Sequence, residues 1–179
     1  MKRAVSVMSV LLLIITSMAQ AVVYQSSEAF LDEVFRGKVP RPKMIWLTGD
    51  IKEVATDIVS HPPSSLRTRY WQDGQRSVWI LEEIGKEKPI TTGIVIKQGK
   101  IEKIRVLIFR ESRGWEVKRE AFTDQFVNVT LTEDKELNQT IDGITGATLS
   151  VRALKKLARL ALYLDSRVQT KHEQNKDKN

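Results

Sequence analysis

The sequence has no cysteine among its 179 residues and only two histidines, His61 and His172. A disulfide, a thiolate nucleophile, a cysteine-ligated iron–sulfur cluster and a lipid-modified cysteine are therefore excluded. Two histidines are too few for a multi-histidine metal site, and they argue against axial ligation of haem. No Gly-x-Gly-x-x-Gly segment follows an expected strand, so we expect no binding of NAD.

Acidic side chains are in deficit, because 22 Asp and Glu stand against 29 Lys and Arg and give a net charge of +7. Part of this excess, from Arg152 to Arg159, lies on one side of an expected helix, which is typical of a solvated face. Nucleic-acid binding needs a basic surface joined to a recognisable motif, so we expect no nucleic acid partner. An acidic redox partner or an anionic membrane fits the modest excess better.

The N-terminus has charge only at Lys2 and Arg3, and an apolar run over residues 4–15 follows directly. Small residues at Ala19 and Ala21 stand where a signal peptidase cleaves. We therefore predict a signal peptide over residues 1–21 and export to the periplasm of a Gram-negative bacterium. The alternative is an uncleaved anchor, because the uncharged stretch exceeds the roughly 20 residues of a membrane helix.

The rest of the chain has the size of one domain, over residues 22–166, and enough apolar residues for a core. Apolar spacing predicts two short helices, at residues 28–35 and from Thr48 to Ile58. Asp73-Gly74 and Gln98-Gly99 are typical of tight turns between strands. The four strands expected around these turns cover residues 66–71, 76–84, 92–97 and 101–109.

A terminal amphipathic helix is the most regular pattern, with apolar residues at helical spacing from Leu149 to Leu164. After Asp165 the composition becomes polar and charged, which predicts a disordered tail over residues 167–179. Two hairpins followed by this helix predict an α+β fold, in which an antiparallel sheet packs against helices gathered on one of its sides.

The segment Asp142-Gly143-Ile144-Thr145-Gly146-Ala147-Thr148 directly precedes this helix. Its two glycines allow the backbone to turn sharply and to approach a ligand closely. A helix N-terminus offers unpaired N–H groups and a partial positive charge, which favour a phosphate. From the residues alone, a second interpretation stands beside this one, in which Thr148 or Ser150 is an ordinary N-cap.

The same segment resembles the Ser/Thr-Gly-Ala-Thr flavinylation signature of FMN-binding domains, which occur in the C and G subunits of sodium-pumping quinone reductase and Rnf complexes and in small periplasmic relatives. The segment Glu111-Ser112-Arg113-Gly114-Trp115 resembles the Glu-Thr-Pro-Gly-Leu element of that family. Phe122-Thr123-Asp124-Gln125-Phe126 resembles its aromatic-x-x-Gln-Phe segment. Arg113, Trp115 and Glu116 depart from the proline, leucine and glycine that are usual there.

The resemblance implies one FMN attached covalently by a phosphoester to Thr148. It further implies a separate flavin transferase that takes FMN from FAD and attaches it. The function expected from it is a periplasmic electron carrier or redox subunit, rather than a stand-alone enzyme. Its redox partner would be a cytochrome or a quinone-linked complex. Two alternatives remain, a module that binds flavin noncovalently as a sensor or delivery protein, and an exported interaction protein in which the glycine loop is only a turn.

The resemblance also assigns roles to residues around the acceptor. Asp142 and Thr145 would shape the loop and present it to the transferase, or form an Asx-type turn that only stabilises the loop. Gly143 and Gly146 permit close approach, and Ala147 completes the signature. Within the second element, Trp115 stacks on the flavin ring or lies in the core. Arg113 stabilises reduced flavin or is a surface arginine. Glu111 fixes the loop through backbone N–H groups or is solvated, and Ser112 and Gly114 complete the element.

Overall fold

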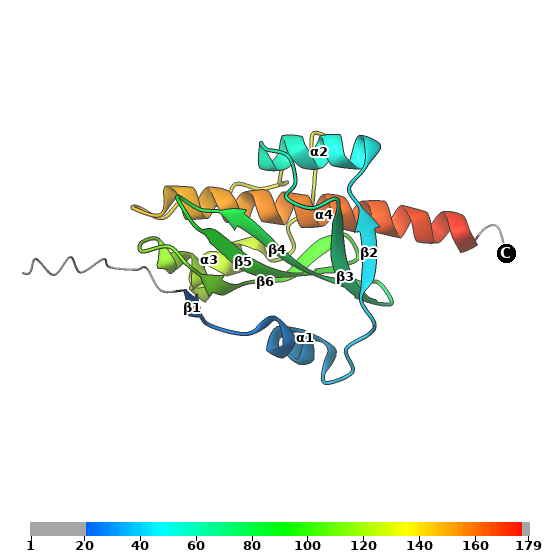
Figure 1. The fold of residues 1–179 in the computed structure, drawn as a ribbon, viewed down its shortest axis with the longest axis horizontal. Helices are drawn as coiled ribbons and strands as arrows, with labels where there is room; N and C mark the ends of the chain where they lie inside the picture. Colours follow the sequence, from blue (N-terminus) through cyan, green and yellow to red (C-terminus); the bar gives the residue numbers. More distant parts are fainter. Residues whose placement is uncertain (1–20, 177–179) are drawn as a thin grey trace, which may run out of the picture.

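The computed structural model describes residues 21–176 and consists of one antiparallel sheet with helices on both faces (Figure 1). The expected signal peptide lies almost entirely outside the described residues. Among residues 21–176, no helix combines the length and the apolar character that crossing a membrane requires. In chain order, the elements are β1 (Val22–Val23), α1 (Ser27–Phe35), β2 (Lys43–Trp46), α2 (Gly49–Val59), β3 (Arg67–Asp73), β4 (Arg76–Ile84), β5 (Pro89–Lys97), β6 (Lys100–Phe109), the 3-10 helix η1 (Trp115–Lys118), α3 (Glu120–Thr123), the 3-10 helix η2 (Asp124–Phe126) and α4 (Thr148–Lys176).

The sheet has the strand order β1-β6-β5-β4-β3-β2, and all neighbours are antiparallel. The two predicted hairpins are present, and their turns place Gly74, Gln98 and Gly99 at positive φ. Both edge strands escaped prediction. β1 has two residues and β2 has four, directly after Pro42, so neither is long enough to display an alternating pattern.

The two faces of the sheet carry separate apolar clusters. α4 and part of α2 cover the larger cluster, whereas α1 covers the smaller one around Val78, Val95 and Leu107 (Figure 1). Our prediction that the helices gather on one side is therefore wrong for α1. This helix lies so close to β5 that a Cβ on Gly93 would come within 2.4 Å of the Phe30 ring. Glycine at residue 93 is what allows α1 to pack there.

A β-bulge explains the imperfect apolar alternation near the end of β6. Thr91 pairs with Ile108 and Thr92 with Val106, so Leu107 is an extra residue in the ladder. As a consequence, Leu107 and Ile108 both pack against the α1 cluster, while Val106 and Phe109 join the larger core.

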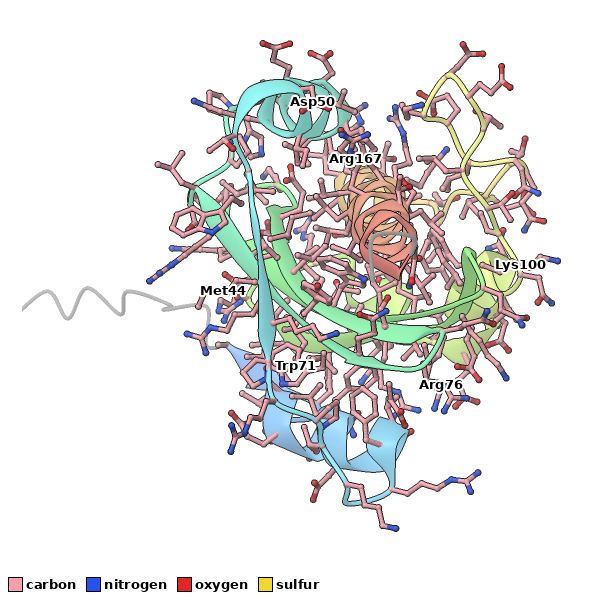
Figure 2. All side chains as sticks on the ribbon, turned by 90° about the vertical axis from the view of Figure 1, so that its right-hand side faces the viewer. Met44, Asp50, Trp71, Arg76, Lys100 and Arg167 are labelled. Carbon is pink, nitrogen blue, oxygen red and sulfur yellow. The ribbon has the colours of Figure 1, made fainter. Side chains whose placement is uncertain are left out.

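The short helices begin where the sequence predicts. The Ser26 hydroxyl accepts a hydrogen bond from the Ala29 N–H at 3.1 Å and caps α1, and Thr48 precedes α2. α4, in contrast, continues to Lys176, so our prediction of a disordered tail is wrong for residues 167–176. Val168 extends the buried stripe, and Arg167 donates to Asp50 on α2 at 2.8 Å (Figure 2).

Candidate functional site

A pocket of about 560 Å³ opens at the N-terminal end of α4. It joins three segments that are distant in the sequence, namely the β4–β5 turn, the segment after β6 and the start of α4. This brings both signature elements to one place. The lining residues are Lys86, Glu111, Ser112, Arg113, Gly146, Ala147, Thr148, Leu149 and Ser150.

Thr148 is the first residue of α4 and is exposed to solvent. Ala147 precedes it at the N-cap position and accepts the first helical hydrogen bond, from the Val151 N–H at 2.9 Å. An alanine side chain has no oxygen with which to cap the helix. The backbone N–H groups of Thr148, Leu149 and Ser150 therefore have no partner within the helix. Neither Thr148 nor Ser150 is the ordinary N-cap that the second interpretation of this segment required.

The Thr148 hydroxyl is free as well as exposed. Among the described side chains, none forms a hydrogen bond with it. Gly146, two residues earlier, has a φ of +82° and turns the chain into the helix. The turn is closed by a hydrogen bond of 2.9 Å from the Ala147 N–H to the Ile144 carbonyl. The loop thus presents a hydroxyl beside three unpaired N–H groups, which is the local arrangement that an anion requires.

Gly114 is the point where the upstream element meets α4. Its φ is +84°, and a Cβ at this position would come within 2.7 Å of the Ser150 Oγ and 3.4 Å of the Ala147 Cβ. Only glycine therefore allows both this backbone conformation and this approach. The contact holds residues 111–113 against the first turn of the helix and closes one side of the pocket.

Glu111 is fixed by the β4–β5 turn. Its Oε1 accepts hydrogen bonds from the N–H groups of Lys86 at 2.5 Å, Glu87 at 2.6 Å and Lys88 at 2.9 Å. Burial alone would raise the pKa of Glu111, but these three donors outweigh it and the pKa is lowered. The backbone hydrogen bonds expected of Glu111 are therefore present, and the segment that they hold is the turn that carries Lys86.

Gln125 anchors the other side of the loop. Its Oε1 accepts a hydrogen bond from the Asp142 N–H at 2.7 Å, and its carbonyl accepts one from the Gln139 Nε2 at 2.5 Å. The flanking Phe122 and Phe126 are buried, with their rings in edge-to-face contact at 5.6 Å, and they hold Gln125 in place. The resemblance of this segment to the family is visible in the sequence, but nothing there indicates the role of Gln125.

Five predicted site residues lie outside the pocket lining, and one of them is Gly114, whose contact with α4 is described above. Asp142, Gly143 and Thr145 are exposed on the loop that leads into it. Trp115 is 40% exposed, so it is not a core residue, and the Arg119 guanidinium lies 4.8 Å from the centre of its ring. The structure adds Lys86, Leu149 and Ser150 to the site. Nothing in the sequence indicates Lys86, which the fold brings in from a different turn.

The chemistry of this pocket fits the phosphate end of a nucleotide. Lys86 and Arg113 supply positive charge, and the three N–H groups of α4 supply directed donors. Its volume lies within the roughly 300–1,000 Å³ that is usual for cofactor sites. Among the described side chains, which end at residue 170, no group of three or more His, Asp or Glu is arranged to hold a metal ion. The residues thus suit an organic anion that is held at the helix terminus.

Comparison with known proteins yielded one family. The FMN-binding domain model matches residues 85–163, a range that contains the β4–β5 turn, both signature elements and the larger part of α4. A search of curated proteins found no match.

Proposed function

Residues 85–163 belong to the FMN-binding domain family, which makes this chain a flavin-binding protein, and on that premise we propose that it carries one FMN as a phosphoester on Thr148 and transfers electrons. The observation that carries the proposal is the free Thr148 hydroxyl at an uncapped helix N-terminus. A phosphoester keeps one negative charge, which the unpaired N–H groups of the first turn would stabilise.

Attachment requires a partner that supplies activated FMN, and we assign this step to a flavin transferase using FAD. The Thr148 oxygen forms the new bond to phosphorus, the pyrophosphate bond of FAD breaks, AMP leaves, and the hydroxyl proton is released. Thr148 is exposed, so a second protein can reach it. Gln125 and Gly146 hold the preceding loop in the conformation that presents the hydroxyl.

The remaining pocket residues orient the bound nucleotide in this proposal. Lys86 and Arg113 lie on the pocket wall and would neutralise the phosphate, while Glu111 keeps Lys86 in position through the turn backbone. Glu111 has its Oε1 occupied by backbone N–H groups, so it suits this positioning role better than proton transfer. Flavin, when bound, supplies one- and two-electron chemistry.

We propose a periplasmic location, reached through the N-terminal signal segment, with a membrane or periplasmic redox partner such as a cytochrome or a quinone-linked complex. A covalent link suits that compartment, because a carrier outside the cytoplasm has no pool of free flavin from which to replace a lost cofactor. The alternative of an uncleaved N-terminal anchor would keep the same domain at the membrane surface.

The test is to express the full chain with a flavin transferase in a host that exports it, and to measure the intact mass. We expect a gain of one FMN less water, and fluorescence that survives denaturation and gel separation. Thr148→Ala should abolish both signals, because no other hydroxyl stands at the helix terminus in the same way. Thr140→Ala, which changes an exposed threonine in the preceding segment, is the matched control and should remain fluorescent.

The outcomes separate the alternatives. Fluorescence that persists in Thr148→Ala would move the attachment to another residue. Flavin that co-purifies with the native protein but is lost on denaturation would replace the covalent carrier by a noncovalent flavin-binding module. Protein without any flavin absorption, isolated from a host with an active transferase, would favour an interaction protein.

A further inference from the structure

The sheet opens between β3 and β4. These strands pair only from Tyr70↔Trp79 to Asp73↔Arg76, next to their turn. Residues Arg67–Arg69 remain paired with β2, and residues Ile80–Ile84 remain paired with β5. Figure 1 shows the result, because β2 and β3 run side by side at a steep angle to the other strands. The β2–β3 ribbon thus stays joined to β4 next to the turn and diverges from it farther along.

A cleft of about 690 Å³ lies at this opening. One wall is β4 at residues 80–83, the other is β3 at residues 67–69, and Leu31 of α1 and Met44 of β2 extend the apolar lining. In the part of the chain that the structure describes, no strand pairs with β4 at Ile80–Ile84 on the side of the cleft. An unpaired strand edge is a template for main-chain hydrogen bonds with another extended segment.

Within the described part of the chain, most carboxylates of the cleft are held in ion pairs, whereas its arginines are not. Glu82 lies 3.4 Å from Arg110, and Glu83 is bound by His61 at 3.0 Å and Lys156 at 3.3 Å. Arg67 and Arg69 of β3 are exposed, and neither forms an ion pair among the described side chains. Among the described carboxylates that line the cleft, Glu28 in the first turn of α1 is the one without an ion pair. The cleft therefore has two arginines and one carboxylate outside ion pairs.

Exposed apolar side chains lie on the strands that form this opening, and one of them, Met44, lines the cleft. Met44 is 47% exposed, Trp46 is 56% exposed and Ile84 is 55% exposed, and the Arg67 guanidinium lies 5.9 Å from the centre of the Trp46 ring. Large apolar side chains gathered on a surface mark interaction sites. An open strand edge, apolar side chains and unpaired arginines together suit an extended peptide that alternates apolar and acidic residues.

We propose that this cleft binds an extended segment of a partner protein, which pairs with the open edge of β4 and places acidic side chains against Arg67 and Arg69. The cleft shares no lining residue with the pocket at Thr148. This second site is therefore separate from the flavin site, and its existence does not depend on flavin attachment.

The test uses two synthetic peptides on the full chain, one alternating valine with glutamate and one alternating valine with lysine. The glutamate peptide should bind, and the lysine peptide should bind more weakly by about tenfold. Hydrogen exchange at the amides of residues 80–84 should slow when the glutamate peptide is added, because pairing would protect them. The Arg67→Glu/Arg69→Glu variant should lose the glutamate peptide and gain the lysine peptide.

The matched control is Lys97→Glu/Lys100→Glu, which makes the same charge change at the β5–β6 turn. Figure 2 shows Lys100 on the opposite side of the molecule from Met44. This variant should bind the glutamate peptide as the wild type does. Failure of the peptide to bind, equal binding by both arginine and lysine variants, or unchanged exchange at residues 80–84 would each overturn the proposal. Binding to phosphatidylglycerol vesicles through Arg67 and Arg69, without peptide binding, would overturn it in favour of a lipid surface.

Discussion

The first turn of α4 and the buried part of the helix around Asp165 bond their polar groups in opposite ways. At the first turn, Thr148 is exposed and the leading N–H groups have no partner in the helix. Further along, Asp165 is 2% exposed, yet it accepts hydrogen bonds from Ser77 at 2.6 Å and Gln169 at 3.2 Å. Trp79 completes this buried network by donating its Nε1–H to the Ser77 Oγ at 2.8 Å.

This difference separates scaffold from site. A buried polar group without a hydrogen-bond partner lowers the stability of the fold by about 1–3 kcal/mol, so the buried part of the helix around Asp165 has its polar atoms paired. The first turn leaves its donors unpaired beside an open pocket, and these donors are therefore available to a ligand. Changes at the first turn should therefore alter flavin attachment, whereas changes around Asp165 should alter stability alone.

The largest effect is expected at Gly114. Gly114→Ala should lower the free energy of unfolding by about 2–4 kcal/mol, from left-handed backbone strain and from the clash with Ser150. It should also reduce FMN incorporation, since residues 111–113 would shift away from α4. Denaturant unfolding and intact mass measure the two effects.

Two further variants sharpen that result. Gly74→Ala has the same kind of strain, with a φ of +55°, but nothing lies within 4 Å of its Cβ. It should cost about 1 kcal/mol and leave FMN incorporation unchanged. Adding Ser150→Ala to Gly114→Ala should recover part of the lost incorporation. Normal flavin loading in Gly114→Ala alone would show that this contact does not form the site.

Ser77→Ala is the corresponding change beside Asp165, which lies in the buried part of the helix. It removes the hydroxyl that links Trp79 to Asp165, so we expect a loss of about 1–3 kcal/mol in unfolding free energy. FMN incorporation should remain at the wild-type level. A Ser77→Ala protein that is fully stable but poorly flavinylated would contradict the division between the first turn of α4 and its buried part.

The pH dependence of stability tests the same buried network. Burial raises the pKa of Asp165 above its ordinary 3.8, although the bonds from Ser77 and Gln169 act in the opposite direction. The folded state then holds this proton more tightly than the unfolded state. Stability from this group is full below 3.8 and is lost as pH rises through the elevated pKa.

Asp165→Asn keeps the acceptor oxygen and removes the titration. The difference in unfolding free energy, wild type minus variant, should decline as pH rises from below 3.8 to neutrality. Glu33, whose pKa is lowered to about 2 by Lys103 and Gln25, and Glu111 titrate in the opposite sense. Both groups are present in the two proteins and cancel in the difference. A difference that stays constant with pH would mean that Asp165 titrates as in the unfolded chain.

The smallest effect is expected for the ion pair between Asp50 and Arg167, which joins α2 to α4 at the surface (Figure 2). Its side chains are 69% and 42% exposed, so Asp50→Asn should change the unfolding free energy by no more than about 0.5 kcal/mol. A loss of unfolding free energy near that of Ser77→Ala would show that this surface ion pair helps to hold α4 against α2.

Local patterns predicted much of the fold. The capping residue of α1, the turns at Gly74 and Gly99, and the apolar stripe of α4 each act over a few neighbouring residues, so each is visible in the sequence. The full length of α4 was not visible, because the contacts of Arg167 with α2 and of Val168 with the core are long-range and leave no trace in the polar local composition. The position of α1 on the other face was not visible either, because it depends on the close packing of Phe30 against Gly93, which is a long-range contact.

For the site, the sequence by itself determined where the candidate loop 142–148 lies, because the glycines, the threonine and the following helix are adjacent in the chain. Only the tertiary structure decided what surrounds Thr148. Lys86 enters through a turn that Glu111 holds, Gln125 fixes the loop at Asp142, and Gly114 closes the contact with α4. These groups come from separate segments, and their meeting depends on how the sheet and α4 pack, which no local pattern contains.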